Sequence, residues 1–179
     1  MKTRICLAIM VLSIIFSITG CQSEIRSDVE LLVKQEADSN VIAAVASDPR
    51  TNVYATKLKE FSFDLDLDNE EETFELYTAA GRGDKGELLW DDGQRWLLVA
   101  IDGNKYYTLF SEYVQLGDVY FNFSTIGEDK IPNVTVMVTS GCGLKVIDYV
   151  FNREKDYYQE EIVFKSNDKN SFFTSIPGY

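Results

Sequence analysis

The alternation of apolar and polar residues in the C-terminal two thirds of the chain most constrains its fold. Every second residue from Val134 to Val138 is a valine, which is typical of a strand with one buried face. Asp102-Gly103-Asn104 separates two further apolar runs and is a strong signal for a β-hairpin. The predicted hairpin strands are 96–101 with 105–110, and 144–151 with 157–164. From about Phe61 onward the chain is therefore predicted to form antiparallel β-hairpins.

A short helical region is predicted before the β-rich part. Ser27 and Glu30 have the spacing of a capping box, and residues 28–37 carry apolar side chains at helical intervals. Asp38-Ser39-Asn40 interrupts this pattern, and residues 41–46 suit either a second short helix or a strand. The predicted organisation is an N-terminal helical region at 28–52 followed by a β-rich domain at 53–179.

Residues 61–110 and 120–164 present strands, loops and a hairpin in a similar order. This similarity indicates two degenerate repeats, packed either as a sandwich of two sheets or as propeller-like blades. Two copies are too few to close a propeller, whereas two packed sheets would bury the same apolar faces. The predicted fold class is thus mainly β within an α+β chain, with longer loops at 80–95 and 124–133.

The N-terminal segment 1–20 has the features of a secretion signal. Lys2 and Arg4 precede residues 5–18, which are apolar apart from two serines. As a helix this apolar run would be about 21 Å long, which is shorter than a hydrocarbon core of roughly 30 Å. A run of this length is typical of the apolar region of a signal peptide.

Ile18-Thr19-Gly20-Cys21 resembles the lipobox of bacterial lipoproteins. The resemblance implies that Cys21 receives a diacylglyceryl group and becomes the first residue of the mature chain. Residues 21–27 would then be a short tether, and the protein would be anchored at the extracytoplasmic face of the cell membrane. The alternative is an ordinary signal peptide that is followed by an unmodified cysteine.

Composition excludes several classes of function. Acidic residues number 29 against 17 basic ones, so the net charge of −12 disfavours nucleic-acid binding and an electrostatic grip on anionic lipids. The chain has no histidine, which excludes Ser-His-Asp and Cys-His catalysis and His-ligated zinc. With Cys6 in the signal and Cys21 lipidated, Cys142 has no disulfide partner, and we expect it to be a small buried residue.

The strongest chemical signal is an acidic segment, residues 64–75, in which seven of twelve residues are Asp or Glu. Oxygen ligands at alternate positions suit a hard cation such as Ca²⁺, which accepts six to eight of them. Zinc is disfavoured because the segment holds neither histidine nor cysteine. The candidate metal ligands are Asp64, Asp66, Asp68, Glu70, Glu72 and Glu75.

Two calcium-loop templates fit this segment. The EF-hand spacing would use Asp64, Asp66 and Asp68 with Glu75 at its last position, the Glu70 carbonyl and Glu72 between them. The segment also resembles the Asp-rich loops of FG-GAP/VCBS-type surface proteins, although Leu67 and Asn69 stand where glycines are usual. That resemblance implies the ligands Asp64, Asp66, Asp68 and Glu72, with Glu75 directed elsewhere.

A third interpretation needs no metal. Phe61, Phe63, Leu65 and Leu67 alternate with polar residues, as in an amphipathic strand that has a solvated acidic face.

The function expected from these features is a non-catalytic, calcium-stabilised binding module with an unidentified protein or glycan partner. The alternative is a glycosidase-like enzyme that uses a carboxylate pair, with Asp91 or Glu87 beside the aromatic residues Trp90 and Trp96. A close pair of carboxylates lining a cleft with an exposed tryptophan would favour the enzyme.

Overall fold

The computed structural model describes residues 40–126 and 131–166, and in these ranges all regular secondary structure is β. The signal, Cys21, the tether and the predicted helix at 28–37 lie outside the described residues. Within the described part there is no helix long and apolar enough to cross a bilayer. The strands are β1 Val41–Ala43, β2 Thr56–Phe63, β3 Glu72–Thr78, β4 Gly93–Asp102, β5 Lys105–Gln115, β6 Val119–Ile126, β7 Ile131–Ser140, β8 Gly143–Asn152 and β9 Tyr157–Lys165.

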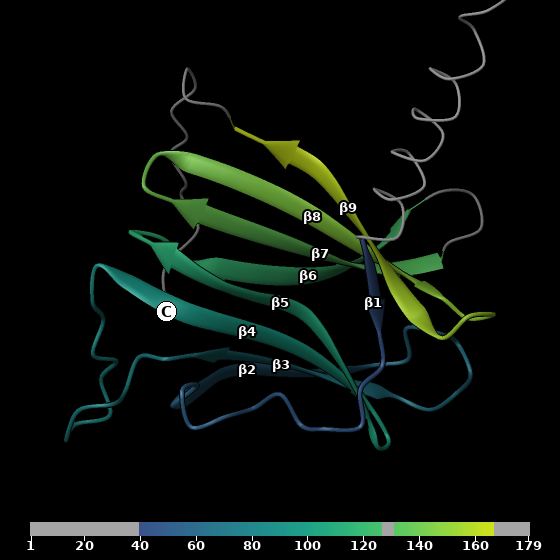
Figure 1. The fold of residues 1–179 in the computed structure, drawn as a ribbon, viewed down its shortest axis with the longest axis horizontal. Coiled ribbons are helices and arrows are strands. Elements are labelled where there is room, and N and C mark those ends of the chain that lie inside the picture. The colour runs from purple at the N-terminus through teal and green to yellow at the C-terminus, as the bar shows by residue number, and fades with distance from the viewer. Residues whose placement is uncertain (1–39, 127–130, 167–179) are drawn as a thin grey trace, which may run out of the picture. The chain divides into compact units, whose positions relative to one another are not determined.

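The strands form two antiparallel sheets (Figure 1). One has the order β2-β3-β4-β5 and the other the order β1-β9-β8-β7-β6. Each half of the β-rich region therefore supplies a meander of four consecutive strands, and β1 joins the second sheet at its edge. The sheets are not closed into a barrel, and their arrangement is consistent with a sandwich. Both predicted hairpins are confirmed, as β4–β5 and β8–β9.

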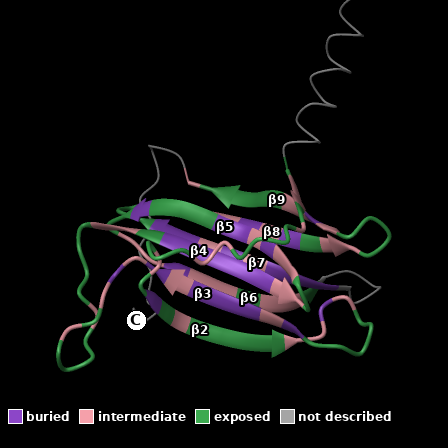
Figure 2. Ribbon diagram, turned by 60° about the horizontal axis from the view of Figure 1, so that its bottom comes forward, coloured by how far each residue is buried: buried purple, intermediate pink, exposed green. Residues whose placement is uncertain are grey.

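A single apolar core lies between the two sheets. Buried side chains come from the central strands of both, including Phe74, Leu98, Val136 and Tyr149. Burial is concentrated in β3, β4 and β7, whereas β2 and most of β9 are exposed (Figure 2). The predicted alternation in β7 is confirmed, because Val134, Val136 and Val138 are all buried.

Contacts on both sides join the sheets along their edges. On one side the β2 and β6 edges meet through aromatic rings, with Phe63 stacked on Phe123 at a centroid distance of 4.9 Å. On the other side, residues 41–43 pair with β9, and Val45 then exchanges two backbone hydrogen bonds with Tyr106 of β5. Of the two alternatives for residues 41–46, the strand is the one observed.

Two expectations about local structure are wrong. Residues 124–126 and 131–133, expected in a long loop, extend β6 and β7, because they pair with one another in register. Cys142, expected to be buried, is exposed. It lies in the tight turn between β7 and β8, where Gly141 has a φ of 55° and both turn residues are exposed.

Candidate functional site

The acidic segment begins as a loop and not as a strand. β2 ends at Phe63 and β3 begins at Glu72, so residues 64–71 connect two paired strands. Leu65 is 1% exposed and fixes this loop to the core. An amphipathic strand with a solvated acidic face is therefore not what the structure shows for residues 64–71.

Three carboxylates of this loop converge with that of Glu72, the first residue of β3. Asp64, Asp66, Asp68 and Glu72 each offer one oxygen, and these four oxygens all lie within 4.8 Å of one another. Glu72 is buried, Asp64 and Asp66 are partly buried, and Asp68 is exposed. Such a group of oxygen ligands, open on one side, can hold a hard metal ion that completes its coordination with water.

Backbone N–H groups of the loop hold these carboxylates in place. The Asp68 N–H donates to Asp64 Oδ1 and Asp66 Oδ1, both at 3.1 Å, and the Asn69 N–H donates to Asp64 Oδ2 at 3.1 Å. Deeper in the loop, the Leu65 N–H donates to Glu72 Oε2 at 2.7 Å. The side chains are thus oriented toward a common centre by the fold of the loop itself.

Among the described residues no ion pair involves the four grouped carboxylates, although the charge of Arg153 acts to lower the pKa of Asp66. Burial raises the pKa of Glu72 to about 7, and the charge of Asp66 adds to this effect, while the Leu65 N–H opposes it. Burial also raises the pKa of Asp66, with contributions from the charges of Asp68 and Asp64. A carboxylate whose pKa is raised in this way is more stable beside a cation, so a bound metal would favour the ionised form.

The loop backbone is strained at one position. Leu67 has a φ of 59°, in the left-handed region that side chains other than glycine and asparagine rarely adopt, and it is 51% exposed. We expect Leu67→Gly to raise the free energy of unfolding by about 0.5 kcal/mol, because relief of strain outweighs the added freedom of the unfolded chain. Urea denaturation measures this change. Leu67→Ala keeps the strain and should give no gain; equal gains in both variants would contradict the argument.

Glu70 and Glu75, the other two predicted ligands, are not among the grouped oxygens. Glu72 and Glu75 are three residues apart in β3, and side chains at odd separations in a strand lie on opposite faces. Glu75 accordingly lies apart from the cluster and accepts bonds from Arg50, Lys57 and Tyr77. The four grouped residues match the set implied by the FG-GAP/VCBS resemblance, whereas the EF-hand spacing would need Glu75.

A second site lies near the aromatic segment in which the sequence indicated a carboxylate pair. Trp90 is 41% exposed, and its ring stacks on the buried Trp96 at a centroid distance of 5.7 Å. Asp91 lines a pocket beside Trp90, but Glu87 accepts a bond from the Lys85 N–H within its own turn instead. The predicted Asp91–Glu87 pair does not line this pocket together.

Asp118, which sequence reasoning missed, lines the same pocket as Asp91 and Trp90. It belongs to Leu116-Gly117-Asp118, the connection between β5 and β6, and it is far from Trp90 in the sequence. Only the crossing of the chain between the sheets brings the two residues together. A Gly-Asp pair between two strands signals a turn, and that was the only signal available.

The two sites thus differ in how they are assembled, one from a contiguous loop and one from separate segments. Neither contains histidine or cysteine, so both offer carboxylate oxygens as their charged groups. No protein-family model, curated protein or solved structure matches this chain.

Proposed function

We propose that this protein is a lipid-anchored, extracytoplasmic binding module whose β-rich domain is stabilised by one calcium ion. The observation that carries the metal assignment is the convergence of Asp64, Asp66, Asp68 and Glu72, with oxygens within 4.8 Å of one another. The loop that bears three of them joins β2 to the buried strand β3, so an ion bound there would fix the β2–β3 hairpin.

Calcium fits the site better than the common alternatives. Zinc prefers histidine and cysteine, which the site lacks, and Mg²⁺ demands a nearly ideal octahedron and keeps most of its water. Calcium accepts irregular sets of oxygen ligands and binds extracellular modules with dissociation constants of about 10⁻⁴–10⁻³ M. The remaining ligands of a calcium ion would be water, backbone carbonyls or second oxygens of the same carboxylates.

The anchor and the metal support one another in this proposal. Lipidation at Cys21 would hold the domain outside the cytoplasm, where calcium reaches millimolar levels and a weak site is occupied. Two acyl chains give stable attachment, whereas a single chain gives only reversible binding. The acidic chain needs such an anchor, because its net charge of −12 is repelled by anionic lipids.

Thermal unfolding tests the metal site. Two millimolar calcium should stabilise the folded protein by about 0.6–2 kcal/mol, which corresponds to a rise of roughly 3–8 °C in Tm. Asp66→Ala should abolish this rise, because it removes a central ligand. Glu71→Ala removes an equal charge from the same loop but no grouped ligand, and it should keep the rise. A Tm that calcium leaves unchanged in the unmodified protein would refute the metal site.

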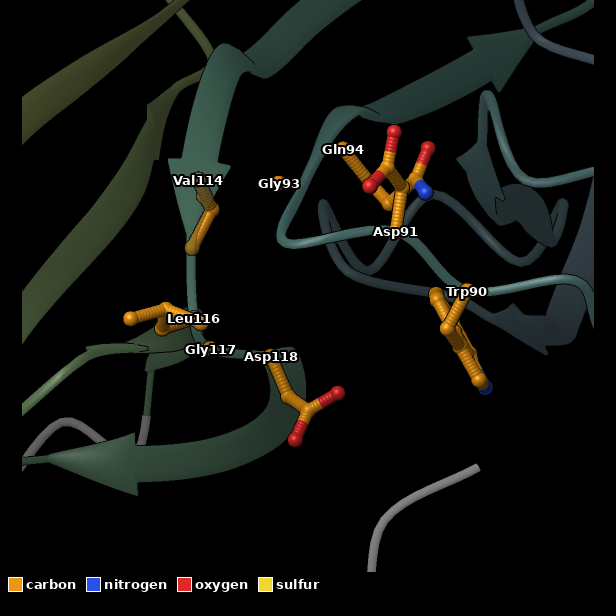
Figure 3. A pocket seen from close by; sticks show the side chains of 8 residues that line it. All are labelled: Trp90, Asp91, Gly93, Gln94, Val114, Leu116, Gly117 and Asp118. Carbon is orange, nitrogen blue, oxygen red and sulfur yellow. The ribbon is translucent and has the colours of Figure 1, made fainter.

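One observation partly supports the alternative that the protein is a glycosidase-like enzyme. Asp91, Asp118 and the exposed Trp90 line a common pocket. Figure 3 shows, however, that the Asp91 and Asp118 carboxylates extend toward different sides of that pocket. A glycosidase needs its two carboxylates to converge on one glycosidic bond, and these two point away from each other (Figure 3), so this arrangement favours binding over hydrolysis.

A further inference from the structure

The pocket beside Trp90 lies where the chain passes from one sheet to the other. It has a volume of about 340 Å³, within the range of roughly 300–1,000 Å³ that small-ligand sites occupy. Its lining residues are Trp90, Asp91, Gly93, Gln94, Val114, Leu116, Gly117 and Asp118. They come from the loop before β4, from β4 and β5, and from the β5–β6 connection.

Backbone hydrogen bonds fix the wall formed by the β5–β6 connection. The Leu116 N–H donates to the Asp92 carbonyl at 2.7 Å, and the Gly141 N–H donates to the Leu116 carbonyl at 2.8 Å. The Asp118 N–H donates to Thr139 Oγ1 at 2.9 Å. Because this wall is bonded to both neighbouring segments, the pocket is formed before any ligand arrives.

Trp90 supplies a preformed aromatic surface. One face of its ring is covered by Trp96, at an interplanar angle of 20°, and 41% of the residue is exposed. Since Trp96 is fully buried, the stack holds the Trp90 ring in place, and a ligand need not order it on binding. A tryptophan face attracts cations more strongly than the other aromatic rings do.

Asp118 supplies a negative charge on the same side. Figure 3 shows its carboxylate and the Trp90 ring extending to one side of the pocket. Asp118 Oδ2 accepts a hydrogen bond from the Tyr120 hydroxyl at 3.2 Å, and no described residue donates a hydrogen bond to its other oxygen. Among the described residues, neither Asp118 nor Asp91 forms an ion pair, so the pocket has a charge that a positive ligand would balance.

We propose that the pocket binds a guanidinium or ammonium side chain of a protein partner, held between the Asp118 carboxylate and the free face of Trp90. A cation gains a charge-assisted hydrogen bond from the first and a cation–π contact from the second. The exposed apolar side chains of Leu116 and Tyr113, at the pocket wall and over Gly93, suit the surface around an interface anchor. This inference deepens the proposed binding role but does not depend on the calcium site.

The test uses the full chain in detergent micelles with calcium present. Two-dimensional NMR resolves the indole N–H signals of its two tryptophans, and Trp90→Phe assigns them. The probes are acetyl-Gly-Arg-Gly-amide and the same peptide with citrulline, which has nearly the same shape but no charge. We expect the arginine peptide to shift the Trp90 signal and the citrulline peptide to leave it unchanged.

Two variants separate the role of Asp118 from a general loss of charge. Asp118→Asn should weaken binding of the arginine peptide at least about tenfold, because it removes a charge-assisted bond. Asp84→Asn removes an equal charge from an exposed loop residue outside the pocket and should change the affinity less than twofold.

Three results would overturn the proposal. They are equal binding of both peptides, equal weakening of peptide binding by the two variants, or a shift of the Trp90 signal with the oligosaccharide chitotriose but with neither peptide. The calcium-dependent rise in Tm is measured on the same protein preparations, with and without calcium. If calcium does not raise Tm but the arginine peptide still binds, only the metal site is refuted. If calcium raises Tm but the peptide does not bind, only the pocket proposal is refuted.

Discussion

Gly117→Ala is expected to lower the free energy of unfolding by about 3 kcal/mol or more, the largest effect we predict for a single methyl group. A Cβ at this position would lie 1.9 Å from the carbonyl oxygen of Thr139 and 2.5 Å from its carbonyl carbon. These atoms belong to a paired strand, so they cannot move aside as a flexible side chain would. The connection between the sheets must then separate from β7, which also disrupts the pocket wall.

Gly81→Ala provides the matched control for this substitution. No atom lies within 4 Å of a Cβ built at Gly81, and its φ is outside the left-handed region. This variant should be neutral or slightly more stable, because alanine restricts the unfolded chain. Chemical denaturation monitored by tryptophan fluorescence compares the two. Equal stabilities would show that the close approach at Gly117 does not limit the fold.

Glu75→Gln is expected to lower the free energy of unfolding by about 2–3 kcal/mol at pH 7, because it removes the charge from a buried hydrogen-bond acceptor. Glu75 is 5% exposed and accepts from Arg50 Nη1 at 2.6 Å, Lys57 Nζ at 3.1 Å and the Tyr77 hydroxyl at 2.8 Å. Burial alone would raise the pKa of Glu75, but the bonds from Tyr77, Lys57 and Arg50 hold it below its ordinary value of 4.5.

The sign of the pH dependence follows from this lowered pKa. A carboxyl group that ionises more readily when folded stabilises the protein fully above its unfolded pKa, and this contribution is lost as pH falls through the folded value. The difference in the free energy of unfolding between the unmodified protein and Glu75→Gln should therefore be constant near neutral pH and shrink below about pH 4.5. A difference that stays the same down to pH 3 would contradict the role of the charge.

Asp48→Asn is the control for the Arg50 ion pairs. Arg50 pairs with Asp48 and Glu75 at the same distance of 2.6 Å, but the Asp48 side chain is 40% exposed and that of Glu75 only 7%. An exposed pair contributes little, so Asp48→Asn should cost less than about 1 kcal/mol.

The β-hairpins were predictable because their signals are local. Alternation fixes which face of a strand is buried, and Asp102-Gly103-Asn104 fixes one turn, so neither needs knowledge of distant residues. Residues 41–46 were ambiguous for the opposite reason. Their strand conformation depends on pairing with Gln159 and Tyr106, which lie far away in the sequence.

The same distinction explains the two sites. The acidic cluster is carried by one short loop, so its residue types and spacing were visible in the sequence. A template based on spacing alone nevertheless includes Glu75. Such a template takes no account of where β3 begins, and from that point successive side chains lie on opposite faces of the sheet. The Trp90–Asp118 pocket depends on a crossing between sheets, which no local pattern encodes.

The pairing of residues 40–45 with both sheets has a mechanical consequence. The Asn40 carbonyl accepts from the Glu160 N–H and from Gln159 Nε2, and five residues later Val45 is bonded to β5. If the chain is anchored at Cys21 as proposed, tension from the membrane enters the domain at Asn40. It would load the short β1 ladder first, and release of β1 would remove one of the contacts that join the two sheets. The strength of this ladder would then set the pulling force at which the domain begins to open.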